Sequence, residues 1–94
     1  DRGLIMTEIT TTIPVTVRFF AAARAAAGAE TRALTLRPGS TVSDAICELS
    51  AQSDEIALVL RKCSFLCDGF AVRDTGTVLR AHQTLDVLPP FSGG

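Results

Sequence analysis

A two-residue alternation of apolar and polar side chains constrains the start of this chain to β-strands. Apolar residues occupy every second position of Pro14–Phe20, and similar spacing returns in Thr31–Arg37. The segment between them, Ala21–Ala27, is rich in alanine, the best helix former, but seven residues without a cap make at most a short turn of helix ending at Gly28. The side chains expected to face the core are Val15, Val17, Phe19, Leu34 and Leu36.

A change of period from two to 3.6 predicts a helix after the turn signal Pro38-Gly39. Thr41 is the expected N-cap, and Asp44, three residues on, is its capping-box partner. This helix is expected to end near Gln52. Its apolar stripe consists of Val42, Ala45, Ile46 and Leu49.

The next segment fits two structures. Ser53-Asp54-Glu55 is a possible helix start for a second short helix through about Arg61. The apolar run Ile56–Leu60 fits a buried strand equally well, and periodicity alone does not decide between them.

The end of the chain predicts a hairpin and one more strand. Asp68-Gly69 is a strong two-residue turn signal between Ser64–Cys67 and Phe70–Arg73, and Leu85–Leu88 is a strand stopped by prolines. The element order predicts an α+β fold of the β-grasp, ubiquitin-like type, with a mixed sheet of four to five strands on one main helix. We expect one domain over residues 1–94, with a flexible segment at 1–13 and an extended functional tail at 89–94.

Composition excludes several function classes. The formal net charge is −1 and the basic residues form no block, so nucleic-acid binding has no electrostatic support. The apolar runs are too short to span a bilayer, and no apolar segment follows a basic start. We therefore expect a cytoplasmic protein without membrane partners, whose natural start is Met6.

The last residues carry the main functional signal. No residue after Asp86 has a charged side chain, and Pro89-Pro90 stiffens the segment into an extended conformation. Gly93 and Gly94 carry no Cβ, so the backbone can enter a slot where a side chain would clash. A frayed polar end is the alternative, but it predicts polar residues instead of Pro-Pro-Phe leading into Gly-Gly. The final carboxylate of Gly94 is therefore the expected working group.

Two segments resemble a known family. Val17-Arg18-Phe19-Phe20-Ala21, followed by Arg24 and Gly28, is similar to the opening of the molybdopterin synthase small subunits. The ending Leu88-Pro89-Pro90-Phe91-Ser92-Gly93-Gly94 resembles their terminal signature. The resemblance covers about residues 14–94.

The resemblance implies a ubiquitin-like sulfur carrier with no bound cofactor and no catalytic side chains. An E1-like enzyme would adenylate the Gly94 carboxylate with ATP and Mg²⁺, and the acyl group would become a thiocarboxylate. The tail, including Phe91 and Ser92, would then enter a large subunit, in a hetero-oligomer expected to be a heterotetramer. There it would donate sulfur to cyclic pyranopterin monophosphate during molybdenum cofactor biosynthesis.

The chain departs from the family at two places. Ala25 stands where members often have Glu, and Ala81-His82-Gln83 replaces an acidic turn that contains Gly. Carriers for thiazole (thiamine) and cysteine synthesis also end in Gly-Gly, as do modifiers that form isopeptide bonds. Pro89-Pro90 favours the molybdopterin branch, while the identity of the pathway and of the sulfur donor stays open.

A docking patch is expected beside the tail. If Val15, Val17 and Phe19 face the helix, strand parity turns Phe20 away from the core, and the same reasoning applies to Leu88. Val72 would join these apolar residues, and Arg24 would be a surface or interface cation. Scattered surface apolar residues are the alternative interpretation.

The cysteines weakly suggest other classes of site. Cys63 and Cys67 have a spacing that zinc allows, and Cys47 with His82 would complete four ligands. The helix stripe, however, places Cys47 off the core face, so no metal is expected. An odd count of three cysteines also argues against a disulfide framework and falls short of the four that a plant-type [2Fe–2S] electron-transfer cluster needs.

Overall fold

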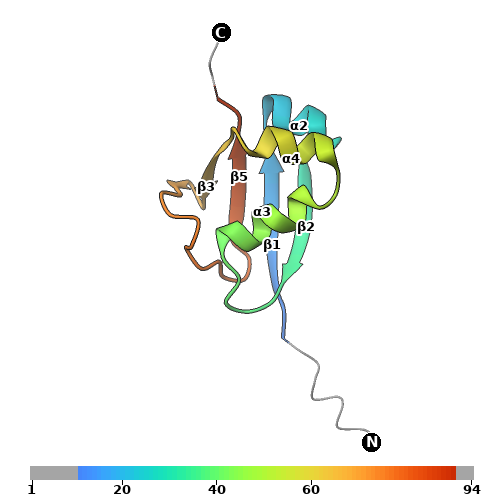
Figure 1. The fold of residues 1–94 in the computed structure, drawn as a ribbon. Helices are drawn as coiled ribbons and strands as arrows, with labels where there is room; N and C mark the ends of the chain where they lie inside the picture. Colours follow the sequence, from blue (N-terminus) through green and yellow to red (C-terminus); the bar gives the residue numbers. More distant parts are fainter. Residues whose placement is uncertain (1–10, 91–94) are drawn as a thin grey trace, which may run out of the picture.

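The computed structural model describes residues 11–90, which form a mixed sheet with helices on one face (Figure 1). The strand order is β2-β1-β5-β3-β4; β1 runs parallel to β5, and the other neighbours are antiparallel. This topology is a β-grasp, as the element order predicted. The elements are β1 (Ile13–Phe19), α2 (Ala21–Ala27), β2 (Thr31–Leu36), α3 (Val42–Ser50), α4 (Asp54–Leu60), β3 (Ser64–Cys67), β4 (Phe70–Ala71) and β5 (Thr84–Leu88).

The core lies between the inner face of the sheet and the helices. Every residue of the predicted strand faces is buried, and the helices α3 and α4 supply the opposite wall. Complete removal of these side chains from water is the main stabilising contribution, about 1.5–3 kcal/mol for each large one. The buried helical residues are Ala23, Val42, Ala45, Leu49, Ile56 and Leu60.

The first strand differs slightly from its predicted bounds. β1 begins at Ile13, inside the segment expected to be flexible, because Ile13 pairs with Leu36 of β2. It ends at Phe19, and Phe20 becomes the N-cap residue of α2. Residues 1–10 lie outside the described part of the chain, so the expectation for them is not tested.

The alanine-rich segment forms a full short helix, α2. Gly28 ends it with φ 71°, a left-handed conformation that glycine adopts without strain, and its N–H donates to Arg24 O at 2.9 Å. At the other end, Ala21 has φ 51°, which is uncommon for a residue with a Cβ. This conformation turns the chain from β1 into α2 immediately after Phe20.

The two remaining helices begin at capping residues. In α3, Thr41 and Asp44 form the predicted capping box, with Asp44 N–H donating to Thr41 Oγ1 at 3.2 Å and Thr41 N–H donating to Asp44 Oδ2 at 2.9 Å. The helix ends at Ser50, two residues before the predicted Gln52. The segment that fitted two structures is the helix α4, capped by Ser53, so the strand alternative is wrong.

The hairpin turn adopts the conformation that its sequence predicts. Asp68 and Gly69 have φ values of 50° and 86°, as a type I′ turn requires. The second strand of the hairpin is shorter than predicted, because β4 stops at Ala71 and the loop to β5 follows. No helix in residues 11–90 has both the length and the apolar character that crossing a membrane requires.

The capping box gives a stability prediction. Thr41→Ala should lower the free energy of unfolding by about 0.5–2 kcal/mol, because it leaves the Asp44 N–H without its side-chain acceptor. Ser43→Ala, at an exposed position one residue into the same helix, is the matched control. Urea unfolding of the two variants measures the difference, and equal stability would contradict the capping argument.

Candidate functional site

The tail leaves the domain from the middle of the sheet. β5 lies between β1 and β3 and ends at Leu88, after which Pro89 is half-buried and Pro90 is exposed. The chain emerges at the end of the molecule where α2 and α4 lie (Figure 1). The other predicted tail residues, Phe91, Ser92, Gly93 and Gly94, lie outside the described residues.

Phe20 and Leu88 flank the base of the tail. The Phe20 N–H donates to Val87 O at 3.2 Å, which continues the β1–β5 pairing by one residue and holds Phe20 alongside Leu88. The Phe20 side chain is exposed to 37%, whereas Leu88 is half-buried. Strand parity therefore turns Phe20 outward, as predicted, on the face of the sheet that the helices leave uncovered.

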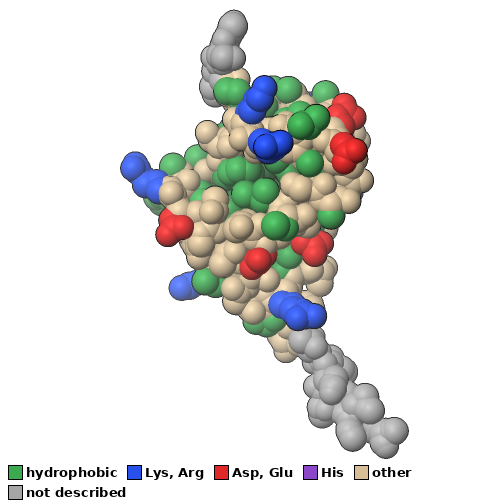
Figure 2. Space-filling view, viewed as in Figure 1, with side chains coloured by type: hydrophobic (Ala, Val, Ile, Leu, Met, Phe, Trp, Pro, Cys, Tyr) green, Lys and Arg blue, Asp and Glu red, His purple; other side chains and the backbone are tan. Residues whose placement is uncertain are grey.

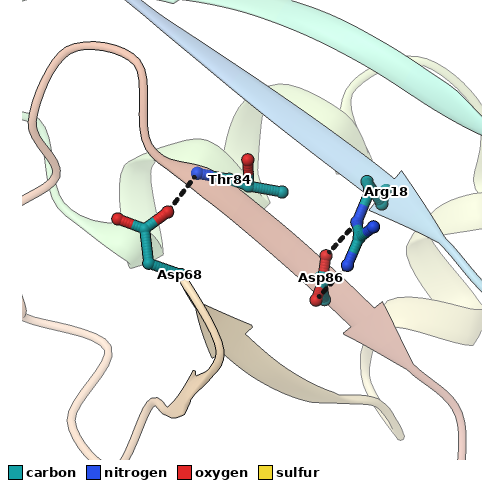
Figure 3. A network of polar contacts seen from close by, with 4 residues as sticks. All are labelled: Arg18, Asp68, Thr84 and Asp86. Atoms are coloured by element: carbon teal, nitrogen blue, oxygen red, sulfur yellow. Dashed lines mark hydrogen bonds and ion pairs between the residues drawn. The ribbon is translucent and has the colours of Figure 1, made fainter.

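An ion pair occupies the middle of this outer face (Figure 3). Arg18 of β1 and Asp86 of β5 are register partners, and two parallel hydrogen bonds join them, Nε to Oδ1 at 2.7 Å and Nη2 to Oδ2 at 2.9 Å. The Asp86 side chain is exposed to 8% and that of Arg18 to 50%. The hydrogen bond and the charge of Asp86 raise the pKa of Arg18 above its usual value.

Apolar residues lie on both sides of the pair. The Arg18 guanidinium carbon lies 5.4 Å from the centre of the Phe20 ring, within cation–π range. On the other side, the half-buried Leu66 of β3 is the register partner of Asp86. We call the surface formed by the Arg18–Asp86 ion pair and the surrounding Phe20, Leu66 and Leu88 the outer patch.

Arg24 lies at the edge of the outer patch. Its side chain is exposed and pairs with Glu30 at 2.8 Å. Arg18, Phe20, Arg24 and Glu30 share the lining of a shallow hollow of about 230 Å³ between the start of α2 and the start of β2. The structure thus brings together three of the four predicted partner-binding residues.

Val72 is the exception. Its N–H donates to Phe65 O at 2.9 Å, and its half-buried side chain packs against the hydrophobic core. It follows Ala71, the register partner of Leu66, so alternation along the chain turns Val72 to the core side of the sheet. The structure does not place it in the outer patch.

The cysteines occupy separate places. Cys47 is exposed on α3, as the helix stripe predicted, and Cys63 and Cys67 are half-buried. Burial raises the pKa of both half-buried thiols, which makes them weaker nucleophiles and metal ligands at neutral pH. Within residues 11–90, no group of three or more His, Cys, Asp or Glu side chains is arranged to hold a metal ion.

Sequence reasoning did not find the Arg18–Asp86 pair. Each residue sits between two core-facing neighbours, so strand parity alone turns both toward the outer face. Strand parity could therefore have indicated that both side chains lie on the outer face. Their contact, however, depends on the parallel pairing of β1 with β5, which joins residues 68 positions apart. A second link missed by sequence reasoning is Asp68, whose Oδ1 accepts from Thr84 N at 2.9 Å at the start of β5 (Figure 3).

Several solved structures share this fold. The Haloferax volcanii protein HVO 2177 is 27% identical, with a TM-score of 0.78 and coverage of 88% of each chain. SAMP1 from Haloferax volcanii is 25% identical, with a TM-score of 0.76, over 86% of this chain and 99% of that one. One chain in the complex of subunits 1 and 2 of the molybdopterin-converting factor from Helicobacter pylori matches at 18% identity and a TM-score of 0.64. The match covers 87% of this chain and 100% of that one.

Sequence comparison gives a more specific result than the shared fold. No curated protein sequence matches this chain at a significant level. The family model described as the ThiS family, however, matches residues 17–94, from the last three residues of β1 through the entire C-terminal tail. The chain therefore belongs to the ThiS family, of the ubiquitin-like sulfur-carrier type.

Proposed function

We propose that this protein is the sulfur-carrying small subunit of a molybdopterin synthase. The observation that carries the proposal is the tail itself: an uncharged Pro-Pro-Phe-Ser-Gly-Gly ending that leaves a central strand beside the exposed Phe20. Membership of the ThiS family supports the carrier chemistry. The Pro89-Pro90 pair supports the molybdopterin branch over the related pathways.

The chemistry requires activation by another protein. A carboxylate is a poor electrophile, so an E1-like enzyme with Mg²⁺ and ATP would join the Gly94 carboxylate to AMP and release pyrophosphate. A sulfur donor would then displace AMP and leave –C(=O)S⁻ at Gly94. This group is a nucleophile without help from neighbouring side chains, so the carrier needs no acid–base pair of its own.

The outer patch would dock the large subunit. Its charges are already neutralised within the Arg18–Asp86 pair, so covering this face does not strand an isolated charge away from water. Phe20 and Leu88 offer apolar surface next to the tail, and aromatic side chains are enriched at interface centres. The Helicobacter pylori structure, a complex of subunits 1 and 2 of the molybdopterin-converting factor, supports a partner of this kind.

A protein modifier is the second candidate. SAMP1, a small archaeal modifier protein, shares 25% identity and the same fold. In that function the activated Gly94 acyl group would pass to an amine and form an isopeptide bond. Both functions begin with activation of the Gly94 carboxylate. They differ in the nucleophile that attacks the activated acyl group, which is a sulfur donor for the carrier and an amine for the modifier.

Removal of Gly93 and Gly94 should abolish sulfur delivery without unfolding the domain, because both residues follow the last core-forming strand. The assay combines the chain with an activating enzyme, Mg-ATP, a sulfur donor and a large subunit, and follows conversion of cyclic pyranopterin monophosphate. The thermal midpoint is measured in parallel. Cys47→Ser, which alters an exposed thiol on α3, is the control and should retain activity.

Retained conversion by the truncated chain would refute a role for the terminal carboxylate. A wild-type chain that gains sulfur but does not support conversion, with a large subunit known to be active, would favour the thiazole or cysteine pathway. Covalent adducts to lysine side chains would favour the modifier.

Phe20→Asp and Leu88→Asp should each weaken binding of the large subunit by about 2–5 kcal/mol, because each buries an unpaired charge in the contact. Calorimetry measures the affinity, and Val78→Asp, at a position exposed to 53% beside the start of α3, is the matched control. Normal binding by both patch variants would show that the large subunit does not cover the outer patch. An unfolded variant, seen by circular dichroism, would contradict the surface placement.

A further inference from the structure

A second apolar surface lies on the helix side of the tail base. It is a groove of about 300 Å³ between α2, the second half of α4 and the first tail residues. Its lining consists of Ala22, Leu58, Val59, Lys62, Pro89 and Pro90. We call this surface the tail groove.

The tail groove is both open and apolar. Leu58 is exposed to 61%, a large apolar surface for a residue within a helix, and Val59 is half-buried next to it. Lys62 supplies the cation of the lining. In Figure 2, Lys and Arg side chains lie among hydrophobic ones at the upper end of the molecule, where α2 and α4 lie in Figure 1. The groove thus combines an apolar lining with one cationic side chain, that of Lys62.

Chain length fixes how near a partner must come. Residues 91–94 separate Pro90 from the terminal carboxylate, and four residues span at most about 14 Å when fully extended. A protein that encloses the Gly94 acyl group must therefore approach Pro90 within that distance. Because Pro89 and Pro90 are themselves walls of the groove, any such protein also comes within about that distance of the groove.

Contact area selects which partner covers the groove. A stable heteromer buries roughly 800 Å² on each partner, whereas transient encounters bury less. The outer patch offers only Phe20, Leu66 and Leu88 as apolar anchors around its ion pair, and two of these are half-buried. A lasting complex thus needs a footprint that continues beyond the patch. The nearest apolar surface across the tail base is the tail groove.

We propose that the tail groove is a second docking surface for the large subunit, which inserts an apolar side chain beside Leu58 and pairs a carboxylate with Lys62. This inference rests on the proposed function. It adds to the outer patch, which strand parity predicted, a second contact area that the sequence pattern did not indicate. The large subunit would then contact the base of the tail on both sides, at the outer patch and at the tail groove. The tail between them would point into the partner's site with little freedom to swing.

Two variants test the groove without disturbing the core. Leu58→Asp places a charge on its floor, and Ala22→Arg fills it with a long side chain at an exposed helical position where Arg is a good helix former. Each should weaken binding of the large subunit by about tenfold or more in calorimetry. Lys62→Glu should weaken binding too, and more at low ionic strength than at high, because its contribution is electrostatic.

Val78→Asp, of similar exposure and remote from the groove lining, is the control and should bind as the wild type does. Normal affinity in both Leu58→Asp and Ala22→Arg would overturn the groove while leaving the sulfur-carrier function intact. Normal affinity together with slow thiocarboxylate formation would assign the groove to the activating enzyme and would also overturn the proposal. A wild-type chain that binds no large subunit would refute the proposed function and the groove together.

Discussion

The parallel pairing of β1 with β5 is the constraint on which the rest of the structure depends. It joins the two ends of the described chain, with Val17 opposite Leu85 and Phe19 opposite Val87 at the centre of the core. Closing such a long loop costs chain entropy, which the complete burial of these four side chains offsets. The same pairing places Arg18 against Asp86 and Phe20 alongside Leu88 on the other face. Core, outer patch and tail base therefore share one set of backbone hydrogen bonds.

This arrangement suits the proposed carrier function, in which the reactive group would be the C-terminal carboxylate. Such a domain would need only to hold the base of the tail and to offer surfaces that partners contact, while other proteins would supply the chemistry. The outer patch and the tail groove lie on opposite sides of Pro89 and Pro90, so one partner can contact both while enclosing the residues beyond them. The Arg18–Asp86 pair adds a geometric feature to the outer patch, because its paired hydrogen bonds fix the direction of the guanidinium.

Local patterns in the sequence predicted most elements, since their causes are local. The alternation in β1, the Thr41 capping box and the Asp68-Gly69 turn depend on neighbours within a few residues. Helix and strand could not be separated for Ile56–Leu60, because its run of apolar residues has no period. In the structure Ser53 caps a helix there, and the buried residues Ile56 and Leu60 lie about one helical turn apart. The side of the sheet occupied by Val72 depends on the β3–β4 register, and the Arg18–Asp86 contact on the β1–β5 register. The β1–β5 register joins strands at opposite ends of the described chain, so no short stretch of the sequence contains it. The β3–β4 register is local, but which face of that hairpin meets the core depends on the pairing of β3 with β5.

The location of the transferred sulfur tests the central claim most directly. The chain is incubated with its activating enzyme, Mg-ATP and a sulfur donor, then digested, and the C-terminal peptide and the peptides containing Cys47, Cys63 and Cys67 are weighed by mass spectrometry. The account predicts that one sulfur replaces one oxygen at Gly94 and that the cysteine peptides keep their masses. Sulfur on a cysteine, with an unchanged Gly94, would contradict it.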